Sequence, residues 1–149
     1  MATLNPYLHF IDNTEEAFNF YKSVFGGEFT SFQRFKDMPQ GSEEPGCEPI
    51  SEADGEKILH VALPIGKENV LMASDCPESM KDTVTPGNNV SISLATESEE
   101  ETERIFNALS EGGEIKMPLQ KTFWNAYFGM LTDRFGIQWM VNYDYSPQP

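Results

Sequence analysis

The chain has 149 residues, of which 39% are hydrophobic and 12% aromatic, and its 10 basic and 24 acidic residues give a formal net charge of −14. This length suits a single domain with a sizeable core. Nucleic-acid binding needs a basic patch, which so acidic a composition disfavours. No run approaches the roughly 18 apolar residues of a membrane span, and the first residues lack a signal-peptide pattern. We therefore expect a cytoplasmic protein that binds neither nucleic acid nor membrane.

The first half of the chain predicts one strand, one helix and three further strands. PYLHFI reads as a strand, and residues 14–25 place apolar side chains at helical spacing. Asn13 with Glu16 resembles an N-terminal cap, and Gly26-Gly27 supplies the left-handed stop. The three following strands are expected at 28–35, 58–65 and 69–74.

The second half repeats this order. VSISLA, residues 90–95, precedes a helix at 98–111, in which Ser98 and Glu101 form a capping box. Three strands are then expected at 114–120, 126–133 and 137–143. The sequence thus predicts βαβββ twice, in an α+β domain made of two modules at about 1–80 and 86–145.

Two segments fall outside this repeat. Segment 37–57 has three prolines, three glycines and seven acidic residues against one lysine, so we expect an acidic, flexible loop. Residues 144–149 are expected to form a frayed tail.

Strand alternation predicts which side chains face away from the helices. The apolar sets Leu8/Phe10, Leu59/Val61/Leu63/Ile65, Val90/Ile92/Leu94 and Ile137/Trp139/Val141 are assigned to the core. The alternating residues are assigned to a concave ligand-binding cleft, and they contain no carboxylate. They are Tyr7, His9, His60, Met72, Ser74, Ser91, Ser93, Gln138, Met140 and Asn142.

Three further features have structural explanations. Asp133 opens a turn whose fourth position is Gly136, so turn chemistry accounts for that carboxylate better than catalysis does. Gly129 lies within a strand, which indicates a bulge or a close backbone approach. Cys47 and Cys76 lack C-x-x-C spacing and are expected to be free thiols.

The chain resembles the glyoxalase/bleomycin-resistance superfamily, also called vicinal oxygen chelate, and within it the PhnB-like branch. The resemblance rests on PYLHF, FYKSVFGGE, ILHVALPIG with LMASD, IFNALSEGGEIKMPLQKTFW and FGMLTDRFGIQWM. It implies two paired βαβββ modules that form a U-shaped mixed sheet with helices on the outer face, usually in a homodimer.

Metal-dependent members of that superfamily place His, Gln or Glu on the first and last strands of each module. The corresponding positions here hold Tyr7 (or Pro6, in another register), Met72, Ser91 or Ser93, and Met140. Thioethers are soft ligands that suit hard or borderline cations poorly. We therefore predict no metal at the family positions, and no cofactor.

The leading hypothesis is a homodimer that binds a small organic molecule in the cleft. One alternative is a metal-dependent lyase, isomerase or dioxygenase with a rearranged site using His60, with His9 as a second ligand and a third from Cys76, Asp75 or segment 37–57. Another alternative is a non-catalytic dimeric interaction module. The sequence leaves open whether the chain catalyses a reaction and which ligand it binds.

Overall fold

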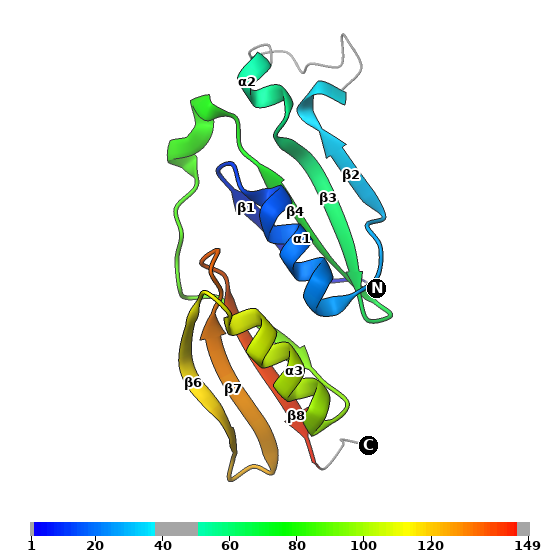
Figure 1. Cartoon of the computed structure of the whole chain (residues 1–149), viewed down its shortest axis with the longest axis vertical. Coiled ribbons are helices and arrows are strands. Elements are labelled where there is room, and N and C mark those ends of the chain that lie inside the picture. The colour runs from blue at the N-terminus through cyan, green and yellow to red at the C-terminus, as the bar shows by residue number, and fades with distance from the viewer. Residues whose placement is uncertain (1, 38–50, 146–149) are drawn as a thin grey trace. The chain divides into compact units, whose positions relative to one another are not determined.

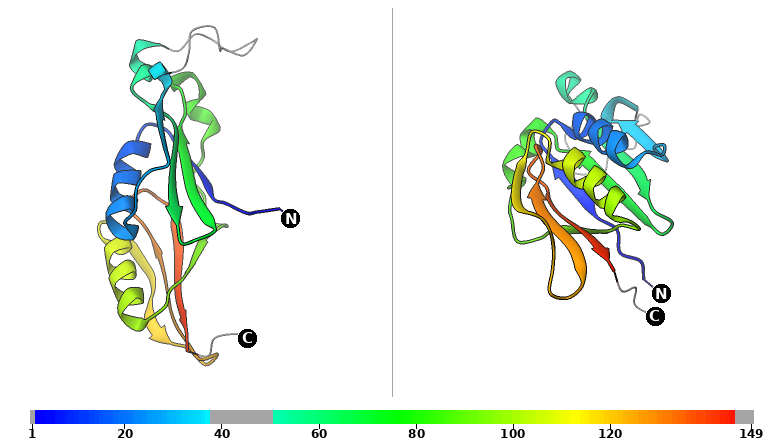
Figure 2. Two further views of the ribbon diagram at one scale, coloured as in Figure 1. Left: turned by 90° about the vertical axis from the view of Figure 1, so that its right-hand side faces the viewer. Right: turned by 60° about the horizontal axis from the view of Figure 1, so that its bottom comes forward.

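The computed structural model describes residues 2–37 and 51–145. The chain divides into two compact units, Met1–Thr85 and Pro86–Pro149. Each contains a four-stranded mixed sheet and one 12-residue helix (Figure 1). Figure 2 shows each of these helices lying on one face of its own sheet. In the described ranges no helix is long and apolar enough to span a bilayer.

The first unit has the strand order β1-β4-β3-β2, in which β1 and β4 are parallel and the other neighbours antiparallel. Its elements are β1 (Tyr7–Phe10), α1 (Thr14–Phe25), β2 (Ser31–Arg34), the 3₁₀ turn η1 (Phe35–Asp37), α2 (Glu52–Gly55), β3 (Ile58–Ile65), β4 (Asn69–Asp75) and the 3₁₀ segment η2 (Glu78–Thr83).

The second unit has the equivalent order β5-β8-β7-β6, again with one parallel pair, β5 and β8. Its elements are β5 (Ile92–Ala95), α3 (Glu99–Ser110), β6 (Glu114–Lys121), β7 (Ala126–Thr132) and β8 (Gln138–Asp144). The predicted α+β architecture with two βαβββ modules is confirmed.

The two long helices begin differently. Ser98 caps α3 as predicted, because its hydroxyl accepts a hydrogen bond from the backbone N–H of Glu101 at 3.0 Å. Asn13 occupies the cap position of α1, but its side chain makes no capping hydrogen bond. The first N–H of α1, on Thr14, instead donates to the carboxylate of Asp75 at the end of β4, at 3.0 Å. The predicted cap by the Asn13 side chain is therefore wrong, because the carboxylate of Asp75, which is distant in sequence, accepts a hydrogen bond from the start of the helix instead.

Each core lies between a sheet and its helix. In the first unit α1 packs on β3 and β4, and Phe18 and Tyr21 of the helix and Val61 and Leu63 of β3 are fully buried. In the second unit α3 packs on β6, β7 and β8, over the fully buried Trp139 and Val141. These are the helix faces and strand faces that the sequence predicts.

Two residues assigned to the core lie elsewhere. The pairing of β2 with β3 shifts between Gln33 and Arg34, and Leu59 becomes the extra residue. Ile58 consequently takes the core position at 1% exposure, whereas Leu59 is half-buried. Val90 is 74% exposed because it lies before the start of β5.

The two irregular segments are more ordered at their ends than predicted. Residues 51–57 of the acidic segment contain α2, whose cap is the Ser51 hydroxyl, while residues 38–50 lie outside the described residues. The predicted frayed tail begins too early. Asp144 is the last residue of β8, and the N–H of Tyr145 donates to the Asn125 carbonyl at 3.0 Å. Residues 146–149 lie outside the described residues.

Candidate functional site

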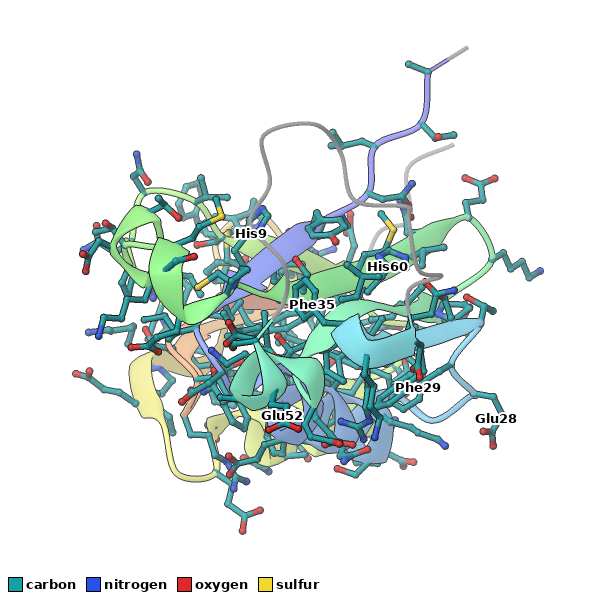
Figure 3. The ribbon with its side chains drawn as sticks, turned by 90° about the horizontal axis from the view of Figure 1, so that it is seen from above. His9, Glu28, Phe29, Phe35, Glu52 and His60 are labelled. Carbon is teal, nitrogen blue, oxygen red and sulfur yellow. The ribbon has the colours of Figure 1, made fainter. Side chains whose placement is uncertain are left out.

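The helix-free face of the first sheet carries all five residues that the sequence assigned to the cleft from this unit. Tyr7 lies opposite Met72, and His9 lies opposite Ser74, on the parallel strands β1 and β4. Met72 also lies opposite Ala62 of β3, and His60 is two residues from Ala62 on the same side of that strand. Figure 3 shows His9 and His60 on one side of the β1 and β3 ribbons, with α1 on the other.

Three aromatic rings meet on this face. The hydroxyl of Tyr7 and Nδ1 of His60 are 3.3 Å apart, and their rings are stacked with centroids 5.8 Å apart and an interplanar angle of 27°. The Tyr7 ring also contacts His9 at a centroid distance of 5.2 Å. Tyr7 remains 40% exposed. The face therefore presents a phenol and two imidazoles that can exchange hydrogen bonds with a bound molecule.

The second unit presents a matching helix-free face. Ser93 of β5 lies opposite Met140 of β8, and Asn142 lies opposite Phe128 of β7. The fourth predicted residue, Gln138, is already hydrogen-bonded, because its Oε1 accepts from the Thr132 hydroxyl at 2.9 Å. These residues share one face, as predicted.

Ser91 is the tenth predicted residue, and it precedes the first residue of β5. It is half-buried, and no strand pairing fixes the side to which it points. Ser93 is consequently the better match to the family position on this strand.

Each unit has two residues at the positions where metal-dependent members of the resembled superfamily carry their metal ligands. The first unit juxtaposes Tyr7 with Met72, and the second juxtaposes Ser93 with Met140. A phenol, an alcohol and two thioethers do not fit a hard or borderline divalent cation, which prefers carboxylate oxygen or imidazole. These residues do not form the family's metal site.

A rearranged site around His60 and His9 lacks a third ligand among the candidates that can be placed. Asp75 lies opposite Phe10, on the core side, and its two oxygens accept from the N–H groups of Thr14 at 3.0 Å and Ile58 at 2.8 Å. Within residues 2–37 and 51–145, no three His, Cys, Asp or Glu side chains are grouped so that they could hold a metal ion.

Cys76, the cysteine in the described part of the chain, does not complete such a site. Burial raises the pKa of the Cys76 thiol above its usual value of 9.0, which leaves less thiolate at neutral pH. The Cys76 sulfur lies 3.9 Å from the carbonyl of Ile11. Cys47 lies outside the described residues.

Three buried carboxylates have structural roles. Asp133 accepts hydrogen bonds from the backbone N–H groups of Phe135 and Ile137 and from the indole N–H of Trp139. Its predicted assignment to turn chemistry is confirmed, and it also fixes the indole. Asp75 joins β4 to α1 and β3, as described above.

Asp54 is the third buried carboxylate, and no sequence pattern indicates its role. It forms an ion pair with Lys57 at 3.1 Å and accepts the Glu78 N–H at 3.2 Å, which joins α2 to η2. Burial alone raises the pKa of Asp54, but these hydrogen bonds outweigh burial and hold that pKa below 3.8.

Sequence reasoning also missed residues on the two helix-free faces. Gln33 of β2 lies opposite His60, and Met117 and Met130 lie opposite each other on β6 and β7. Alternation in AYFGMLT would have placed Met130 beside Met140, since the two strands form a hairpin. Met117 could not be placed in this way because the β6–β7 register shifts on both sides of it.

Similarity to known proteins identifies the family. The model of the Glyoxalase/Bleomycin resistance protein/Dioxygenase superfamily matches residues 3–141. The chain belongs to this superfamily. It is 31% identical over 141 residues to Protein YjdN of Escherichia coli strain K12, covering 93% of each chain.

Two solved structures extend the comparison. Protein PA1353 from Pseudomonas aeruginosa is 41% identical, with 97% of this chain and 98% of that chain covered and a TM-score of 0.79. A Bacillus cereus PhnB protein, described as a putative 3-demethylubiquinone-9 3-methyltransferase, is 28% identical, with 95% and 99% covered and a TM-score of 0.70. The predicted superfamily and its PhnB-like branch are confirmed.

Proposed function

We propose that this PhnB-like protein binds a small organic molecule on the helix-free faces of its sheets, without the divalent cation of its metal-dependent relatives. The observation that carries the proposal is the ring cluster of Tyr7, His9 and His60, which lies on the face of the sheet opposite α1. Ligand sites commonly combine apolar walls with a few placed polar groups, and Met72 and Ser74 continue that pattern beside the rings.

The donor atoms at the family's metal positions argue against a bound divalent cation. The family positions hold a phenol, an alcohol and two thioethers, and the buried carboxylate at the end of β4, Asp75, accepts from two backbone N–H groups on the opposite face. Recognition then depends on hydrogen bonds from the rings and on apolar contact.

The proposal is tested by screening a library of small organic compounds by thermal shift in the presence of EDTA. A compound that binds only the folded protein stabilises it by about 2.7 kcal/mol at a hundredfold excess over Kd. We expect hits whose affinity falls about tenfold in Tyr7→Phe, which removes only the hydroxyl beside His60. Lys22→Ala, on the exposed surface of α1, is the matched control and should bind normally.

Metal analysis of protein purified without a histidine tag accompanies the screen. Near-stoichiometric divalent metal that survives dialysis and is lost in His60→Ala would refute the metal-free proposal and favour the rearranged enzyme site. Hits that bind Tyr7→Phe and wild type equally, and shift only backbone resonances remote from β1 and β3, would refute the proposed location.

We also propose that the protein is a homodimer, as its family usually is. Phe123 and Trp124, in the β6–β7 hairpin, are 97% and 54% exposed, and their rings pack against each other at 4.9 Å. Such exposed aromatic surface is enriched at protein interfaces. Light scattering should give twice the monomer mass of 16.8 kDa, and Phe123→Ser with Trp124→Ser should lower it if this hairpin contributes.

A further inference from the structure

Three methionines lie side by side across the helix-free face of the second sheet. Met117 of β6 lies opposite Met130 of β7, and Met130 lies opposite Met140 of β8. Directly paired residues place their Cβ atoms roughly 4.5–5.5 Å apart on the same face. We call these three residues the methionine row. Their sulfurs all belong to one face and to three consecutive strands.

The methionine row is not part of the core of its unit. All three side chains are half-buried, whereas Leu131 and Trp139 on the opposite face are 1% and 0% exposed. A methionine that only fills a gap in a core would be covered by α3, and this row faces away from that helix. Each of the three side chains is therefore partly exposed to solvent.

Thioether sulfur is neutral, soft and polarisable, and proteins use it as a ligand for Cu(I) and not for hard divalent ions. The outer members of the row are two strand spacings apart, roughly 10 Å at the backbone. Methionine has three rotatable bonds, so Met117 and Met140 can lean inward over Met130. Three thioethers can then surround one ion.

We propose that the methionine row binds one soft monovalent cation, Cu(I) or Ag(I), through three thioether sulfurs. This site goes beyond the proposed organic-ligand site and shares only Met140 with it. Neutral ligands leave the charge of the cation uncompensated, and the formal net charge of −14 on the chain favours cation approach. Binding is a ligand exchange in which the ion keeps its oxidation state, so no oxidant or reductant takes part.

The other donors on this part of the face, including Asn142 two residues along β8 from Met140, are oxygen and nitrogen atoms that suit a soft ion less well than thioether sulfur. Thr132 and Gln138, one step along the strands, are hydrogen-bonded to each other at 2.9 Å. Ser93 ends the row opposite Met140 and offers a hydroxyl, which is a poor ligand for a soft ion.

The direct test is a titration with Ag(I), which is stable in air, of the full chain labelled with ¹³C at the methionine methyl groups. Both cysteines are replaced by serine, Cys47→Ser and Cys76→Ser, because thiolates bind soft ions more tightly than thioethers. We expect three methyl resonances, those of the methionine row, to move together and to saturate at one Ag(I) per chain. The methyl groups of Met72 and Met80 are internal controls and should move little.

The second experiment measures the Cu(I) affinity of the same cysteine-free protein by competition with bicinchoninate. It is carried out under nitrogen, with ascorbate present to keep the copper reduced. Met130→Leu keeps the volume and removes the central sulfur, and we expect it to lower the affinity at least tenfold. Met80→Leu, on the exposed η2 segment of the first unit, is the matched control and should bind as the parent does. Circular dichroism verifies that both variants are folded.

Two results overturn the proposal. One is a titration in which the row's methyl resonances stay fixed or move with separate midpoints, as independent exposed methionines would. The other is a folded Met130→Leu protein that binds Cu(I) with the parent's affinity. Either result leaves the organic-ligand proposal intact, since that proposal rests on the rings of the first unit.

Discussion

The interaction between Asp133 and Trp139 provides a quantitative test of how the second unit is held together. Asp133 is 3% exposed, and one of its oxygens accepts the backbone N–H groups of Phe135 at 2.8 Å and Ile137 at 3.0 Å. The other oxygen accepts the indole N–H of Trp139 at 2.8 Å. The substitution Asp133→Asn keeps the first oxygen as an acceptor and replaces the second with an NH₂ group.

The expected cost follows from that geometry. The introduced NH₂ group faces the indole N–H, so a fully buried donor loses its acceptor. A hydrogen bond to a charged group is worth about 1.5–3 kcal/mol, and leaving a buried donor unsatisfied costs about 1–3 kcal/mol. We expect Asp133→Asn to lower the free energy of unfolding by about 2 kcal/mol. Asp133→Ala removes the acceptor of these three N–H groups and should lower the free energy of unfolding by about 4 kcal/mol.

The assay is urea unfolding followed by far-ultraviolet circular dichroism, which does not depend on indole fluorescence. Trp139→Phe removes the donor, so in that background Asp133→Asn should cost about 1 kcal/mol less than in the wild type. A coupling energy below about 0.5 kcal/mol in this double-mutant cycle would refute the reasoning, because independent sites add to within that amount.

Three further predictions concern single side chains. Asp54→Asn should destabilise the protein by about 3 kcal/mol at pH 7, since it breaks a mostly buried ion pair. The pKa of Asp54 is lower in the folded protein than its unfolded value of 3.8, so the stability that its carboxylate contributes is present above pH 3.8 and is lost as the pH falls through the folded pKa. The urea midpoints of wild type and Asp54→Asn should therefore converge at low pH. A constant difference between the midpoints would contradict this role of Asp54. Ser98→Ala should cost about 1 kcal/mol, whereas Asn13→Ala should cost less than about 0.5 kcal/mol, because of these two side chains Ser98 alone makes a capping hydrogen bond; equal melting curves would contradict this. Burial and the hydrogen bond to Glu99 raise the pKa of Tyr145 to about 12, so ultraviolet titration should show a late-ionising component that moves to lower pH in Glu99→Gln.

Local signals predicted most of the secondary structure. The helix at 14–25 matches the bounds of α1, and the strand at 58–65 matches those of β3. Both rest on contiguous patterns: helical spacing ended by a glycine pair, and an apolar run bounded by polar residues. Gly129 also fits its local pattern: a Cβ there would lie 3.1 Å from the backbone carbonyl oxygen of Met117, as a close backbone approach predicts, and 2.6 Å from the Phe106 ring, which the pattern did not predict.

The prediction failed where pairing between distant strands decides the outcome. Leu59 looks like a core residue by alternation, but the register shift against β2 moves Ile58 into that position. Asn13 looks like a cap, but Asp75, which is 61 residues from the first N–H of the helix, performs the function. No local pattern carries the register of a partner strand or the position of a carboxylate at the end of another strand.

The sequence by itself determined the two-fold βαβββ order and the residue types on the helix-free faces, because periodicity and composition are properties of consecutive residues. Its motifs separately carried the resemblance to the family. Only the tertiary structure decided which of those residues touch. Tyr7 and His60 are 53 residues apart and meet because β1, β4 and β3 are neighbours in one sheet. The methionine row exists only in the register of three strands, since hydrogen bonding between strands places Met117, Met130 and Met140 side by side.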